Sequence, residues 1–172
     1  EKAARKHLGM RQSSVFTVPA RTAVYEDDYL KACNTALATS DPPKKVSKQC
    51  FFLFPKIQEI DALMTPELET RVHEVHPELA FWRLNGEKEM AEPKKVRNRI
   101  HKAGMAERRD LLSACGIPYD FLDATPPRGC GEDDFLDAAA VLLVAARRAR
   151  GEAIPFPDPP GRDSHGLPVA IW

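Results

Sequence analysis

Carboxylates at the start of a strongly apolar segment are the residues in this chain best suited to chemistry. Between Phe135 and Ala146 every residue is apolar except Asp137. A helix that is apolar on all sides is expected to be buried, and a buried carboxylate destabilises the fold unless something pairs with it. Asp133 and Asp134 precede Asp137 by four and three residues, so a helix places all three on one side. A metal ion is one partner that suits this arrangement.

Two plainer interpretations of these acidic residues stay open. Asp is a preferred N-cap residue, and acidic side chains in a first turn complement the helix dipole, so capping explains Asp133 and Asp134 equally well. Asp137 lies inside the apolar run, where a capping residue does not occur. Its alternative role is an internal ion pair, and in that case an Arg or Lys should lie within salt-bridge distance of it.

Glu74 is the acidic residue expected to complete such a site. Residues 71–76 are expected to form a strand that ends before Pro77, and Glu74 and His76 then share one face of it. Mg²⁺ and Mn²⁺ take carboxylate oxygens, and a pair of such ions promotes phosphodiester hydrolysis. We therefore expect Glu74, Asp134 and Asp137 to be metal ligands and catalytic residues. His76 is expected to act as a general base or outer ligand, or else to be structural.

A basic stretch between residues 94 and 102 is the candidate nucleic-acid contact. Five of its nine residues are Lys or Arg, and such residues bind phosphates in a salt-dependent way. The expected contacts are Lys94, Lys95, Arg97 and Arg99. A solvated basic loop is the alternative.

The overall composition limits the class of protein. A chain of 172 residues with 43% hydrophobic residues is expected to form a single domain over residues 1–172. Lys plus Arg and Asp plus Glu are 25 each, which argues against a strongly basic nucleic-acid-coating protein. The longest unbroken apolar run, residues 138–146, is too short to span a membrane. Four cysteines without a CxxC pair predict neither a zinc site nor a disulfide framework, and they favour a cytoplasmic location.

The remaining pattern predicts the elements that position these residues. Helices are expected over residues 1–9, 26–38, 48–64 with a kink or join at Pro55, 77–82, 105–114 and 132–150. A short strand or an extended arm is expected over 13–18, and a strand over 71–76. Residues 152–172 are expected to be a Pro-rich connector followed by an edge strand, because Pro168 cannot occupy the centre of a sheet.

Several motifs, read in order, resemble one family. They are RQSSVF at 11–16, SKQ at 47–49, KIQEID at 56–61, EVHPE at 74–78, KK at 94–95, DDFLDA at 133–138, RD at 162–163, GLP at 166–168 and IW at 171–172. This order resembles the domain-of-unknown-function family described as predicted RNase H-like nucleases. The resemblance implies an RNase H-like α/β domain with a mixed sheet flanked by helices. It also implies that Glu74 lies on the fourth strand and that Asp134 and Asp137, with Asp133 as a neighbour, lie on the last helix.

The start of the chain departs from the family pattern. Members begin with a strand carrying an Asp-Gly-Cys type motif, followed by a second strand, and neither is present here; residues 1–9 match the helix that comes next. We therefore expect a sheet and an active site that are incomplete at the N-terminus, with the missing strands supplied by an upstream segment or by a second copy. The resemblance implies a Mg²⁺- or Mn²⁺-dependent nuclease. The alternative is a non-catalytic RNase H-like module that binds nucleic acid or a protein partner.

Overall fold

Helices form most of the regular secondary structure in this computed structural model, which describes residues 1–172. The helices are α1 (Lys2–Arg5), the 3-10 helix η1 (Gly9–Ser14), α2 (Arg21–Val24), α3 (Tyr29–Thr39), α4 (Lys48–Phe51), α5 (Phe54–Leu63), α6 (Pro66–Glu69), α7 (Pro77–Leu84), α8 (Lys102–Ala114), α9 (Tyr119–Leu122) and α10 (Glu132–Ala149). The strands are β1 (Lys95–Val96), β2 (Arg99–Ile100), β3 (Phe156–Arg162) and β4 (Pro168–Ile171). No helix combines the length and the hydropathy that a membrane span requires.

The strands form two separate antiparallel pairs, so the expected mixture of helices and sheet is confirmed only in that general sense. β1 pairs with β2, and β3 pairs with β4. The single mixed sheet flanked by helices is not present in this chain. The predicted edge strand at the C-terminus is confirmed as β4, whereas the Pro-rich part of the predicted connector is itself a strand, β3, which pairs Arg162 with Pro168.

The predicted strand over 71–76 is wrong, and the strand alternative for residues 13–18 is wrong as well. Residues 13–18 contain the end of η1 followed by irregular chain, and residues 71–76 are without regular structure. The β-branched residues there favour extended backbone, but a strand needs a neighbour that completes its hydrogen-bond ladder. Residue 74 has one such link, in which the backbone N–H of Trp172 donates to the carbonyl of Glu74 at 2.9 Å.

The helix predictions are closer to the structure. The expected helix over 48–64 is divided into α4 and α5, with Pro55 in the first turn of α5, where its missing N–H is tolerated. The expected helix over 1–9 ends at Arg5 instead of continuing to Gly9. The long helix α10 matches the predicted range of 132–150 to within one residue at its end.

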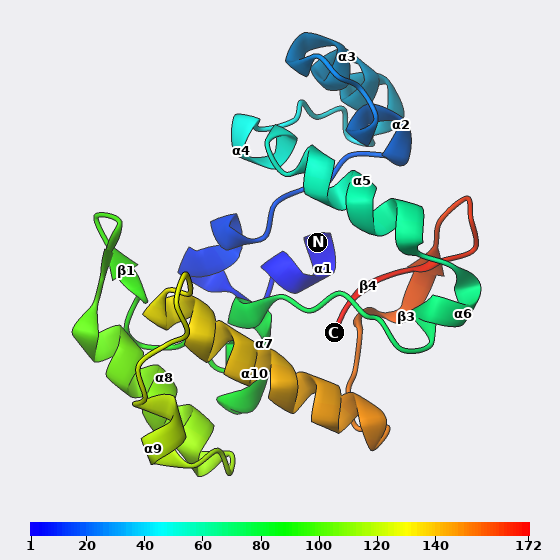
Figure 1. The fold of residues 1–172 in the computed structure, drawn as a ribbon. Helices are drawn as coiled ribbons and strands as arrows, with labels where there is room; N and C mark the ends of the chain where they lie inside the picture. Colours follow the sequence, from blue (N-terminus) through cyan, green and yellow to red (C-terminus); the bar gives the residue numbers. More distant parts are fainter.

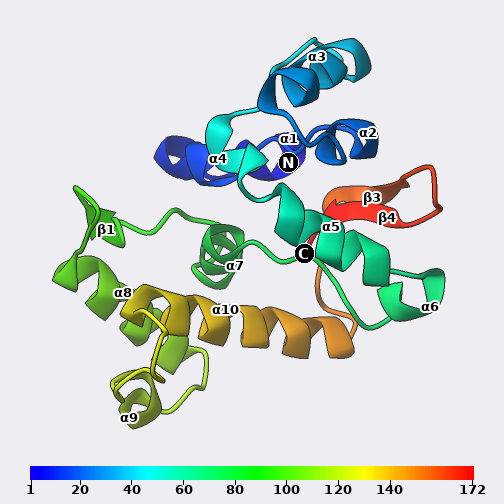
Figure 2. The ribbon, with the colours of Figure 1, turned by 45° about the horizontal axis from the view of Figure 1, so that its top comes forward.

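Helices α7, α8 and α10 enclose the largest core, and Figures 1 and 2 show α10 lying across the other two. The helix α10 buries Asp133, Leu136, Ala139, Ala140 and Val144, whose helical spacing places them on one face. They pack with Phe81 of α7 and with Met105 and Leu112 of α8. Gly131 is the N-cap of α10, and Arg147 and Arg148 lie in its last turn, where cations favour the helix dipole.

The helices α2 to α5 form a second layer with its own core around Cys33, Cys50 and Phe54, seen at the top of Figure 1. Arg21 of α2 joins this layer to the C-terminal hairpin. Its guanidinium donates to Asp61 of α5 at 2.8 Å and to Asp163, beside β3, at 2.7 Å. Because the ion pair favours the charged form of both partners, the pKa of Arg21 is raised and the pKa of Asp61 is lowered.

Candidate functional site

Three acidic side chains gather where the start of α10 meets α7, and we call them the acidic cluster: Glu78, Asp133 and Asp137. Their side chains are 6%, 6% and 14% exposed. Glu78 lies in the first turn of α7, while Asp133 and Asp137 lie one turn apart on α10. Carboxylates this buried need compensation from nearby cations or donors.

The hairpin β1–β2 supplies two of those cations. Lys94 Nζ lies 2.6 Å from Asp137 Oδ2, and Lys95 Nζ lies 2.5 Å from Asp133 Oδ2. Asp133 is the main reason why the pKa of Lys95 is raised. The interpretation of Asp137 as a member of an internal ion pair is therefore confirmed. The hairpin turns at Arg97 and Asn98, which both have positive φ, as a tight two-residue turn requires.

Arg108 of α8 supplies the third cation, and its side chain is fully buried. Its terminal nitrogens donate to Glu78 at 3.3 Å and to the carbonyls of Glu92 and Gly104 at 3.1 and 3.0 Å. Arg11 and Lys94 lie farther from Glu78, at 3.7 and 4.0 Å. The acidic cluster is thus interleaved with basic residues from three separate elements.

Asp137 has one oxygen that the protein leaves unpartnered. Oδ1 is buried and accepts no hydrogen bond, although Oδ2 is bound to Lys94. Burial raises the pKa of Asp137; Lys94 opposes the rise, and the negative charges of Glu78 and Asp133 add to it. A buried carboxylate with an open oxygen is a strong position for a cation.

The raised pKa of Asp137 predicts a pH-dependent effect on stability. The folded protein holds this proton more tightly than the unfolded chain does, so the stability due to protonation is complete below the ordinary carboxyl pKa of about 3.9 and is lost as the pH rises through the raised pKa. Asp137→Asn mimics the protonated form at every pH. We expect it to be more stable than wild type at neutral pH and equal to it in acid, as measured by urea unfolding. Greater stability of the wild type at neutral pH would show that the ion pair with Lys94 outweighs the burial cost.

His76 lies beside this cluster with one free ring nitrogen. Nε2 is 3.2 Å from the carbonyl oxygen of Ser14, which can only accept, so Nε2 carries the proton and Nδ1 offers a lone pair. Nδ1 is buried and has no partner. Burial lowers the pKa of His76, and the nearby charges of Glu78, Lys94 and Asp137 partly cancel. A neutral ring with a free nitrogen lone pair is what general-base chemistry uses, although Nδ1 is closed off from solvent in this structure.

Two of the sequence-predicted ligands do not join this cluster. Asp134 is exposed, and its Oδ2 accepts from the backbone N–H of Gly131 at 3.3 Å, as in a helix cap. Glu74 also reaches solvent; partial desolvation and the nearby Glu1 raise its pKa. Without a strand ladder, nothing in this chain directs residue 74 toward α10. No three Asp, Glu, His or Cys side chains converge closely enough to hold a metal ion.

The predicted basic residues do lie together, but they divide into two groups. Lys94 and Lys95 at the base of the hairpin are bound to the acidic cluster. Arg97 and Arg99 are exposed and form no ion pair.

Sequence reasoning missed Glu78 and Arg108. Glu78 resembles an ordinary first-turn acid, and Arg108 lies in a helix rich in charge. Its position in the sequence could have indicated burial. Arg108 follows Met105 by three residues and precedes Leu112 by four, so it lies on the buried face of α8.

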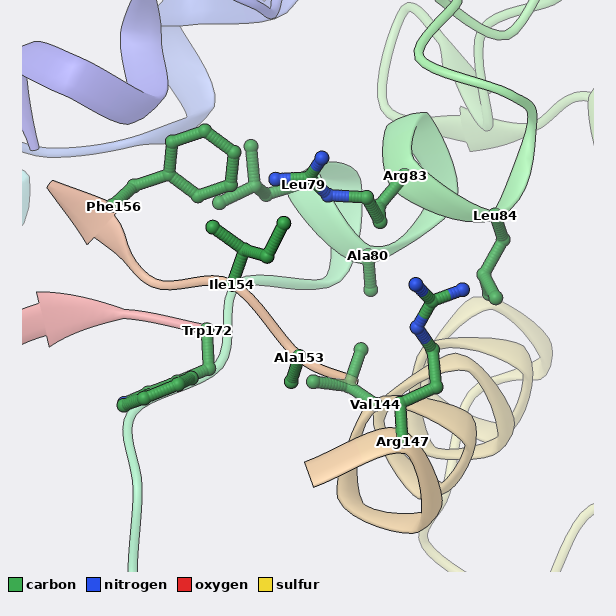
Figure 3. A pocket seen from close by; sticks show the side chains of 10 residues that line it. All are labelled: Leu79, Ala80, Arg83, Leu84, Val144, Arg147, Ala153, Ile154, Phe156 and Trp172. Atoms are coloured by element: carbon green, nitrogen blue, oxygen red, sulfur yellow. The ribbon is translucent and has the colours of Figure 1, made fainter. Parts of the chain in front are cut away.

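An apolar pocket lies apart from this chemistry, on the side of α7 that faces the C-terminal hairpin (Figure 3). Its lining includes Leu79, Val144, Ile154, Phe156 and Trp172, and it contains no carboxylate. The candidate for chemistry is therefore the acidic cluster with Lys94, Lys95 and His76.

Comparison with known proteins gives one match. No curated protein and no solved structure matches the chain significantly. A family model described as protein of unknown function (DUF429) matches residues 1–162, which confirms the expectation of a domain-of-unknown-function family. The chain belongs to the DUF429 family of proteins of unknown function.

Proposed function

We propose that this protein is a metal-dependent nuclease with an RNase H-like fold that hydrolyses phosphodiesters through a two-metal type of mechanism. The observation that carries the proposal is the open, buried Oδ1 of Asp137 beside a second buried carboxylate, Asp133, and a basic hairpin. Fold alone does not imply function, so the argument depends on this site.

In this proposal two carboxylates would hold the divalent cation, because no third ligating side chain lies close enough to complete the site. Mg²⁺ is commonly bound through one or two carboxylates together with substrate phosphates, and it does not need an all-protein cage. Asp133 and Asp137 supply such carboxylates. Asp133 takes the place of the sequence-predicted Asp134, because Asp133 is buried in the cluster while Asp134 caps the helix. A bound Mg²⁺ or Mn²⁺ would supply charge stabilisation and an activated water.

The side chains around these carboxylates have separable roles in the proposal. Asp133 and Asp137 would hold the cation. Arg97 and Arg99, which have no protein partner, bind the phosphates of the incoming strand. His76, whose neutral ring has a free Nδ1, would act as the general base once an attacking water reaches that nitrogen.

The alternative is a non-catalytic RNase H-like module that binds nucleic acid or a protein partner. One observation favours it: the ammonium groups of Lys94 and Lys95 already neutralise Asp137 and Asp133. In this case the exposed Arg97 and Arg99 bind nucleic-acid phosphates, and no phosphodiester is hydrolysed. Replacing both should then lower the slope of log affinity against log salt concentration by about two, one for each lost phosphate contact. This effect should not require a divalent ion.

Mn²⁺ binding, followed by calorimetry, separates the two candidates. We expect Asp137→Asn and Asp133→Asn to weaken Mn²⁺ binding at least tenfold, because each removes a charged oxygen donor. The matched control is Asp134→Asn, which changes an exposed residue on the same turn and should bind like wild type. Equal Mn²⁺ affinity in all four proteins would exclude the metal site. Metal binding without divalent-dependent cleavage of RNA or DNA oligonucleotides would favour the non-catalytic module.

A further inference from the structure

A second group of basic side chains surrounds a cavity at the far end of α10, away from the acidic cluster. The cavity is about 130 Å³, close to the volume that holds benzene in an engineered protein cavity. Val75, Val141, Val144 and Ala145 form its apolar wall, and Arg71, His73, Arg148 and Trp172 complete it. Trp172 and Val144 also border the pocket of Figure 3, so these two residues separate the two spaces.

The two arginines of this cavity have no acceptor in the protein. Neither Arg71 nor Arg148 forms a side-chain hydrogen bond or an ion pair, in contrast to Arg21 and Arg108, which both bind carboxylates. Nε of Arg148 is buried and unpartnered. An unsatisfied buried donor is costly, so the cavity lacks an acceptor that a ligand would provide.

The surroundings of Arg148 add an aromatic surface and an imidazole ring. Its guanidinium lies 3.9 Å from the centre of the Trp172 ring, and the His73 ring lies 5.6 Å from that ring. Burial, reinforced by Arg148, lowers the pKa of His73 against an opposing effect of the nearby Glu69. Glu69 forms no ion pair with either arginine. A neutral His73 can donate to an anionic ligand or accept from it.

We propose that this cavity binds an organic oxyanion, a phosphate monoester or a carboxylate joined to a small apolar or aromatic group. The planar guanidinium groups of Arg71 and Arg148 match the paired oxygens of such a head group. The valines and Trp172 contact the apolar part. The site is distinct from the acidic cluster and does not depend on the proposed nuclease activity.

Calorimetry on the full chain in EDTA, with phenyl phosphate as the probe, tests this proposal. We expect phenyl phosphate to bind at least tenfold more tightly than inorganic phosphate or benzyl alcohol, because each of these supplies only half of the contacts. Arg148→Gln and Arg71→Gln should each weaken binding about tenfold, the effect of losing a charge-assisted hydrogen bond. Benzoate in a parallel titration shows whether the site prefers carboxylate or phosphate.

The matched control is Arg150→Gln at the C-cap of α10, where Arg150 pairs with Glu152 outside the cavity. It should bind phenyl phosphate like wild type. Absence of binding, or equal losses in Arg150→Gln and Arg148→Gln, would overturn the proposal. Arg71 is exposed, so its variant keeps the test valid if Arg148→Gln does not fold. Asp137→Asn should leave phenyl phosphate binding unchanged, which separates failure here from failure of the nuclease proposal.

Discussion

Replacing Arg108 by methionine is expected to destabilise the fold by about 3–5 kcal/mol, the range measured when one partner of a buried ion pair is removed. Arg108 is fully buried, and its guanidinium connects Glu78 of α7 to the carbonyls of Glu92 and Gly104. It also stacks over the ring of Phe81 at 5.1 Å. Methionine fills similar space but leaves the carboxylate of Glu78 with only the more distant Arg11 and Lys94. Urea unfolding of the variant and wild type measures the change.

The double variant Arg108→Met with Glu78→Gln separates the charge from the packing. If the stranded carboxylate is the main cost, the second change should restore about 1–2 kcal/mol, a coupling energy usual for residues in one network. Lys102→Met, an exposed substitution on the same helix, should change stability by less than about 0.5 kcal/mol. A stable Arg108→Met variant would mean that the free-energy cost of desolvating this arginine exceeds the stabilisation from its three hydrogen-bonded contacts.

Gly104→Ala is expected to destabilise the protein by about 3 kcal/mol, at the upper end of the usual range for overpacking. Gly104 lies inside α8, where alanine would ordinarily be favoured by about 1 kcal/mol. Here the new Cβ would meet the backbone oxygen of Pro93 at 2.0 Å, and that chain cannot move without displacing the residues that follow. Because Lys94 comes next, the same change should separate Lys94 from Asp137.

Gly161→Ala is the matched control for this glycine. A Cβ at Gly161 meets nothing within 4 Å and φ is not positive there, so the substitution should be close to neutral. Urea unfolding of both variants gives the comparison. A Gly104→Ala variant that is as stable as Gly161→Ala would contradict the close contact between α8 and the chain before β1.

The sequence predicted the acidic helix α10 well. The strand over 71–76, which was expected to carry Glu74 in the same site, does not form. The apolar run after residue 134 determined α10, and the isolated charge of Asp137 indicated that a partner must exist. The identity of that partner was not predictable from helical spacing, because Lys94 lies 43 residues away. Asp133 and Asp134 are adjacent in sequence, yet only the packing of α10 against α7 and α8 buries the first and exposes the second.

Properties that local chemistry controls could be predicted from the residues alone: the positions of the longer helices, the join near Pro55, the C-terminal edge strand and the need to neutralise Asp137. Which charges meet depends on how the whole chain packs. Glu78, Arg108, Lys94 and Asp137 come from four separate parts of the chain, and the desolvation that makes their pairing matter exists only once α7, α8 and α10 have packed together. The predicted strand at 71–76 also depended on tertiary structure, because a strand needs a neighbouring strand to complete its hydrogen-bond ladder. Residue 74 has only the single backbone hydrogen bond with Trp172.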